Sequence, residues 1–134
     1  MTDIFIAATG EKFDAQKFMQ ESNFPQICEP FKIGGRNKRA ERVAVENGLR
    51  VQILDDENLH IDQCIEYTHQ FIQKNKAEIS RLKNTAGVES VEIKIGIFWQ
   101  LNTACIPISF GDSFLRDIVY CGATLDVIVY GVNS

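Results

Sequence analysis

The sequence predicts an α+β fold in which helices pack on a mostly antiparallel sheet. Three patterns support this prediction: alternating apolar residues at 88–100, apolar residues at helical spacing between 58 and 86, and a hairpin signal at Asn47 and Gly48. Together with the shorter segments they give the element order β-α-β-β-α-β-β-α-β. A chain of 134 residues with 45% apolar content can bury one core, so we expect residues 1–134 to form a single domain.

The N-terminal region predicts one strand and one helix before a loop. Residues 3–8 are almost wholly apolar and are typical of a strand, and Gly10 marks its end. Asp14 can cap the next segment, and we expect a helix over 14–22. Pro25 and Pro30 favour extended or turning backbone, which predicts a loop over 23–30 followed by a brief strand at 31–33.

The residues around Asn47 and Gly48 predict a type I′ hairpin. Both positions of such a turn need positive φ, which Asn and Gly tolerate. Apolar residues alternate on both sides of this pair: Val43 and Val45 before it, and Leu49, Val51 and Ile53 after it.

The segment from 58 to 86 predicts a long helix with a break. Its apolar residues repeat at spacings of three and four, and the pattern changes phase near Asn75. We therefore expect one bent helix or two short ones. The residues that form the first apolar face are Ile61, Cys64, Ile65, Thr68, Phe71 and Ile72.

The C-terminal third predicts a strand pair, a helix and a final strand. We expect 88–100 to be a central strand and 103–110 to return beside it, at an edge or with a bulge because Pro107 cannot donate a ladder hydrogen bond. Asp112 or Ser113 would cap the last helix, Gly122 would end it, and 124–130 would close the sheet. The residues expected to form the buried face of this helix are Phe114, Leu115, Ile118, Val119 and Cys121.

Composition excludes several classes of function. The formal net charge of −4 argues against a general nucleic-acid binder, which needs clustered Lys and Arg to neutralise phosphates. Four dispersed cysteines and no signal-like stretch are typical of reduced thiols in a cytoplasmic protein. No apolar run approaches the length of a membrane span.

Candidate catalytic and metal-binding residues are few. His60 and Cys64 lie one helical turn apart, but a metal site would need further ligands that no motif marks. His60 and His69 would lie about 13 Å apart along a helix, too far to act on one atom. Dinucleotide, nucleophile-elbow and zinc-protease motifs are absent. We therefore expect no cofactor, no metal and no enzymatic activity.

Two charged clusters are candidate binding surfaces. The acidic strip could stabilise the N-terminus of the long helix, form a docking surface for a basic partner, or supply paired catalytic carboxylates. It consists of Asp55, Asp56, Glu57, Asp62 and Glu66. The basic loop, which follows Gly34 and Gly35, could be a solvated loop or could contact an anion or RNA. It consists of Arg36, Lys38, Arg39 and Arg42.

Phe98 raises a separate question, because it points away from the apolar series of its own strand. An exposed Phe98 would be an interface anchor of the kind that aromatic residues often provide. A second covered face of the sheet would explain it equally well.

Four stretches of the sequence together carry a family resemblance: IFIAATGEKFDAQKFMQES at 4–22, ISRL at 79–82, VEIKIGIF at 91–98 and FLRDIVYCGATLDVIVYG at 114–131. They resemble a bacterial family of small α+β domains catalogued as domain of unknown function 4279. The likeness does not extend to 30–42 or 49–53, where the family is expected to carry a proline- and threonine-containing turn and then a strand with Trp. The resemblance implies a small cytoplasmic bacterial domain and supplies no catalytic residues.

The expected function is binding to another protein. Small acidic domains of this kind, without catalytic groups, often act as immunity proteins that neutralise a cognate toxin such as a nuclease. We expect the acidic strip to be the partner-binding surface. The alternatives are an RNA- or anion-binding module that uses the basic loop, and an enzyme of uncharacterised type.

Overall fold

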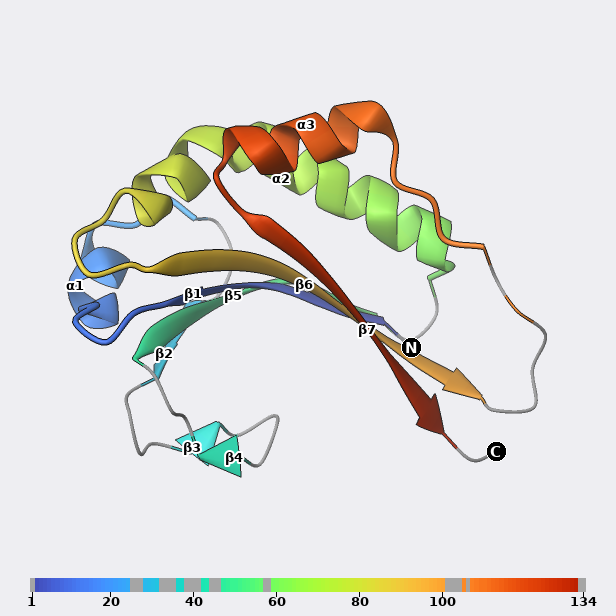
Figure 1. Cartoon of the computed structure of the whole chain (residues 1–134), viewed down its shortest axis with the longest axis horizontal. Coiled ribbons are helices and arrows are strands. Elements are labelled where there is room, and N and C mark those ends of the chain that lie inside the picture. The colour runs from blue at the N-terminus through green and yellow to red at the C-terminus, as the bar shows by residue number, and fades with distance from the viewer. Residues whose placement is uncertain are drawn as a thin grey trace.

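The fold is a five-stranded sheet with helices packed on it, seen in a computed structural model (Figure 1). The structure describes residues 2–24, 28–31, 36–37, 42–43, 47–56, 59–100, 105 and 107–132. Within these ranges the strands are β1 (Thr2–Thr9), β2 (Cys28–Phe31), β3 (Arg36–Asn37), β4 (Arg42–Val43), β5 (Gly48–Asp56), β6 (Ser90–Gln100) and β7 (Thr124–Val132). The helices are α1 (Ala15–Gln20), α2 (Ile61–Lys83) and α3 (Asp112–Tyr120).

The strands of the main sheet lie in the order β2-β5-β1-β6-β7, and β3 and β4 form a separate small pair. All neighbours in the main sheet are antiparallel except β6 and β7. The predicted α+β class and the mostly antiparallel sheet are therefore confirmed. β1 lies at the centre of the sheet, and β6, expected to be central, lies between β1 and β7.

The core lies between one face of the sheet and the helices, which cover that face in Figure 1. Alternate side chains of the inner strands point into it, and Ile4, Ile6, Ile93 and Ile95 have no exposed surface. Because strand side chains alternate, the intervening residues face the side of the sheet without helices. The alternating apolar residues predicted on β6 thus lie in the core from Val91 to Ile97.

The predicted long helix and its break are confirmed in α2. Asn75 leaves the helical region of backbone space, with φ −116° and ψ 18°, at the position where the apolar pattern changes phase. Its Nδ2 donates to the Phe71 carbonyl at 2.9 Å, which satisfies an acceptor at the kink. The helices described here include none that is long and apolar enough to cross a membrane.

The predicted type I′ hairpin at Asn47 and Gly48 is wrong. β5 pairs with β2 on one side and β1 on the other, and Val43, which was expected in the hairpin, pairs with Arg36 instead. Residues 44–46 lie outside the described part of the chain. Gly48 lacks the positive φ of such a turn. It is required for space instead, because a Cβ atom there would lie 2.2 Å from Cζ of Phe31 and 2.6 Å from the Ala8 carbonyl oxygen.

The predicted strand at 103–110 is also wrong, because Cys105 and residues 107–110 have no strand structure. The place beside β6 is taken by β7, which pairs with it in parallel. Parallel neighbours need a crossover connection, and α3 provides it. Residues 101–104 and 106 lie outside the described part of the chain.

The start of β2 and the N-cap of α3 differ from the prediction. β2 begins at Cys28, inside the predicted loop, and only Phe31 of the predicted strand at 31–33 is described. Pro30 is tolerated in this strand because β2 is at the edge of the sheet. At α3 the N-cap is Gly111, with no side-chain cap bond, rather than Asp112 or Ser113.

The predicted buried face of α3 is partly wrong. Phe114, Ile118 and Cys121 are buried as expected, but Leu115 and Val119 are exposed. The helix packs along a narrower face than its apolar content suggests. Two predicted caps are confirmed: Asp14 accepts from the Lys17 amide before α1, and Gly122 has φ +68° after α3.

Candidate functional site

Part of the acidic strip lines a groove between α2 and the start of α3. Asp62 and Glu66 lie one turn apart on the exposed side of α2, and both border a cavity of about 250 Å³. The opposite wall comes from the first turn of α3 and from residues just before it. The full lining is Asp62, Ile65, Glu66, His69, Ser109, Gly111, Asp112, Ser113 and Phe114.

A third carboxylate, Asp112, joins Asp62 and Glu66 across this cavity. We call the cavity with these three carboxylates the acidic groove. Asp112 is exposed and pairs with Arg116 at 3.3 Å, one turn further along α3. Sequence reasoning assigned Asp112 only to capping, because nothing in a linear sequence shows that α3 begins opposite the first turns of α2.

The other residues of the acidic strip do not line the groove. Asp55 pairs across the sheet with Asp3 and Asp56 pairs with Thr2, so alternation sends the Asp55 and Asp56 side chains to opposite faces. Asp56 Oδ1 also accepts a hydrogen bond from the Leu59 amide at 3.3 Å, which supports the approach to α2. Glu57 lies outside the described residues.

A polar cluster that sequence reasoning missed lies at the inner end of the acidic groove. His69 Nε2 lies 3.2 Å from Oδ2 of Asp117 and 3.4 Å from the Ser113 hydroxyl. Lys76 Nζ lies 2.8 Å from Oδ1 of Asp117. We call His69, Lys76 and Asp117 the α2–α3 cluster, because it joins these two helices.

The α2–α3 cluster is an ion pair with a histidine beside it. The hydrogen bond from Lys76 lowers the pKa of Asp117, and it outweighs the burial that acts in the opposite direction. The same bond raises the pKa of Lys76. Asp117 is therefore a carboxylate and Lys76 an ammonium group at neutral pH, which satisfies both charges at the helix interface.

The Ser113, His69 and Asp117 side chains do not have the geometry of a hydrolytic triad. In such a triad the acid contacts Nδ1 of the histidine, and Nε2 is left to accept the serine proton. Here Asp117 and Ser113 both approach Nε2. The arrangement therefore orients His69 without activating the Ser113 hydroxyl as a nucleophile.

His60 has a structural role, and Cys64 and Cys121 are buried. His60 is the N-cap of α2 and forms a reciprocal capping box with Gln63. Burial raises the pKa of the Cys64 thiol and raises that of Cys121 to about 11, so both thiols stay protonated at neutral pH. Within the described ranges, no group of three or more metal-ligating side chains is found.

The basic loop is only partly described. Arg36 lies on β3 opposite Val43, and Arg42 lies on β4 opposite Asn37. Lys38 and Arg39 fall outside the described residues. The predicted anion or RNA contact of Arg36, Lys38, Arg39 and Arg42 stays a prediction.

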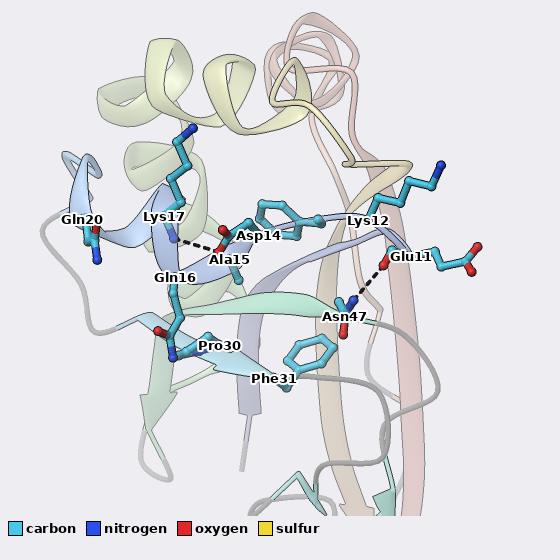
Figure 2. A pocket seen from close by; sticks show the side chains of 11 residues that line it. Glu11, Lys12, Asp14, Ala15, Gln16, Lys17, Gln20, Pro30, Phe31 and Asn47 are labelled. Atoms are coloured by element: carbon cyan, nitrogen blue, oxygen red, sulfur yellow. Dashed lines mark hydrogen bonds between the residues drawn. The ribbon is translucent and has the colours of Figure 1, made fainter.

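A larger cavity of about 830 Å³ lies between the turn after β1, α1 and β2 (Figure 2). Lys12 and Lys17 border it, but their side chains extend away from Pro30 and Phe31 in Figure 2, and Glu11 and Asp14 balance their charge. The cavity does not concentrate one sign of charge or a reactive group. We therefore prefer the acidic groove as the candidate site.

Phe98 is half-buried on the sheet face without helices, where it stacks on Tyr130 of β7 with ring centroids 4.9 Å apart. Its neighbour on the next strand, rather than a second helical layer, accounts for its position. Phe98 is therefore not an isolated exposed anchor.

Comparison of this chain with protein-family models, with curated proteins and with solved structures gives no match. The resemblance to the family of unknown function therefore remains an expectation from the sequence alone.

Proposed function

We propose that this protein is a binding domain that recognises a basic protein partner through the acidic groove. The observation that carries the proposal is the convergence of Asp62, Glu66 and Asp112 on one concave surface from two separate helices. Carboxylates arranged in this way attract cationic side chains and select against acidic partners. The groove also gives an Arg or Lys side chain a defined place to enter.

Exposure makes these carboxylates suitable for binding. Asp62 and Asp112 retain most of their solvent contact, with side chains 71% and 82% exposed. A rim of exposed charge contributes chiefly to the association rate and to the choice of partner, because its hydration is largely retained. The partner would gain its remaining affinity from contacts around the groove.

In its most specific form, the proposal is that the protein neutralises a toxin by occupying a basic surface of that toxin. A nuclease offers such a surface, because its active-site region must bind phosphates. Two features support a binding protein over an enzyme. Asp117 and Ser113 approach the same nitrogen of His69, and burial keeps the Cys64 and Cys121 thiols protonated.

The test is a kinetic and calorimetric titration against the product of the adjacent gene. In the triple variant Asp62→Asn, Glu66→Gln, Asp112→Asn, we expect the association rate at low salt to fall by roughly tenfold or more, with a weaker salt dependence. The matched control is Glu11→Gln, Glu21→Gln, Glu89→Gln, which removes three exposed negative charges away from the groove.

The control should change the rate by less than roughly twofold. An equal loss of association rate in both triple variants would show that net charge alone sets the rate. It would refute the acidic groove as the binding site. Failure of the unmodified protein to form any complex with that gene product would refute the proposed toxin.

A further inference from the structure

Exposed apolar side chains are concentrated on α3 and β7. Eight large apolar residues of the described chain are exposed, and only Tyr67 lies on another element. The other seven are Leu115, Val119, Tyr120, Val127, Ile128, Val129 and Tyr130. Exposed apolar residues gathered on two elements mark an interaction site more often than scattered single residues do.

β7 is an edge strand without the usual protection. β6 pairs along one side of it in an unbroken register, and no described strand pairs with the other side. Natural edges are blunted by short length, proline, lysine or bulges. β7 has nine residues, no proline and no lysine, and Asp126 is its single charge. Within the described part of the chain, its outward N–H and C=O groups are thus open to a further strand.

The exposed flank of α3 lies on the same side as this free edge. Asp117 contacts Lys76 of α2, and Leu115 and Val119 are two residues before and after it, a rotation of about 200° around a helix. They therefore face away from α2. Since α2 contacts β1, β5 and β6 whereas α3 contacts β7, the direction away from α2 is toward the free edge. In Figure 1, β7 lies outermost in front of β6.

We propose that a second copy of this chain covers this surface, with the two β7 strands pairing antiparallel about a two-fold axis at Ile128. The two sheets would then form one continuous ten-stranded sheet. A two-fold contact uses the same surface on both copies and closes on itself, so it gives a dimer rather than a fibre.

The sequence of β7 is complementary to itself in this register. Ile128 lies opposite Ile128 of the second copy, and Val127 lies opposite Val129. Side chains that are directly opposite share one face of the sheet, so the valines would extend the apolar face beneath α3. Asp126 would lie opposite Tyr130, whose hydroxyl can donate to it. Asp126, the only charged residue of β7, therefore does not lie opposite Asp126 of the second copy.

Charge also favours a second copy at this place. The chain has a net charge of −4, which opposes self-association at most of its surface. On α3, however, Arg116 balances Asp112, and β7 contributes only Asp126. Little repulsion between two copies is therefore expected along this edge.

The first test measures the molar mass of the protein alone by sedimentation velocity over a concentration series. We expect a reversible species with twice the 15.1 kDa of the chain. Ile128→Lys places two like charges opposite each other at the two-fold axis and should return the protein to a monomer. The matched control is Tyr67→Lys, which removes an apolar side chain of similar exposure from α2, 45% against 40%, and should leave the dimer intact.

The second test fixes the register by cross-linking. In a Cys28→Ser, Cys105→Ser background, which keeps only the buried Cys64 and Cys121, Ile128→Cys should give a dimer with a short bis-maleimide, because directly opposite Cβ atoms lie about 5 Å apart. The background protein alone and the background with Tyr67→Cys should give none. Val129→Lys, on the other face of β7, is a further monomerising variant if Ile128→Lys fails to fold.

Several outcomes would overturn this proposal. They are a protein that stays monomeric up to its solubility limit, a dimer unaffected by Ile128→Lys and Val129→Lys, an open series of larger species, and cross-linking equal in the Tyr67→Cys control. Both tests use the chain without its partner, so their failure is independent of the proposed toxin binding.

Discussion

The two edges of the sheet have opposite characters. β2 has four residues, includes Pro30 and Glu29, and lies beside α1. β7 has nine residues with exposed apolar side chains on both faces. The first edge has the features that prevent strand addition, and the second has those that permit it. We therefore expect a further strand to add at the β7 edge and not at the β2 edge.

The contacts that hold the two sides differ as well. At the β2 side, Phe13, Phe18, Phe24 and Phe71 form a series of aromatic contacts with centroid distances between 6.2 and 6.5 Å. At the β7 side, α3 is joined to α2 by the α2–α3 cluster as well as by Phe114 and Ile118. Apolar packing therefore dominates one side, and an ion pair contributes to the other.

The largest expected effect comes from breaking the aromatic series. Phe71→Ala should lower the free energy of unfolding by about 3–5 kcal/mol, because it leaves a cavity where a 4% exposed ring stacks on Phe24. Val119→Ala, at a 76% exposed position on the β7 side, should change it by less than about 0.5 kcal/mol in the monomer. Denaturant unfolding of both variants checks this contrast, which equal losses would contradict.

A smaller effect should come from the fit between β2 and β5. Gly48→Ala should lower the free energy of unfolding by about 2 kcal/mol, because the added Cβ meets the Phe31 ring and the Ala8 carbonyl. Gly111→Ala is the matched control at the β7 side, since a Cβ there has no heavy atom within 4 Å. Gly111→Ala should lower the free energy of unfolding by less than about 1 kcal/mol, because it changes only the N-cap residue of α3. Similar losses at both sites, measured by denaturant unfolding, would show that Phe31 moves freely.

The smallest effect is a pH dependence at the β7 side. The pKa of Asp117 is lower in the folded protein than its ordinary value of 3.8, so its contribution to stability is present above that pH and is lost as pH falls through the lowered pKa. Asp117→Asn should flatten the acid side of the profile of unfolding temperature against pH. Asp112→Asn, an exposed carboxylate on the same helix, should keep the wild-type profile. Identical profiles for Asp117→Asn and wild type would contradict the role of the ion pair.

Most of the helices and strands could be predicted, because their apolar periodicity lies within one segment. Ile93 and Ile95 mark the buried face of β6 without reference to any other strand, and the phase change near Asn75 locates the kink of α2. Asp62 and Glu66 were likewise predicted to lie together, since four residues make one helical turn.

Strand partners and the full acidic groove could not be predicted in this way. Asn47 and Gly48 match a hairpin signal, but β5 pairs with β1 and β2, and the space that Gly48 provides is for Phe31. Asp112 joins the groove only because α3 packs on α2. The exposure of Val119 has the same origin, because a helix with many apolar residues does not specify which of them a neighbour will cover.

The amino-acid sequence by itself determined the α+β class, the long broken helix, the helix caps at Asp14 and Gly122, and the pair Asp62 and Glu66. Each of these follows from backbone geometry within about one segment, where spacing fixes which side chains share a face. Tertiary structure alone decided which strands are edges, which carboxylates converge, and where apolar surface remains open. Those properties depend on contacts between segments far apart in the chain, and such contacts leave no periodic signal in either segment.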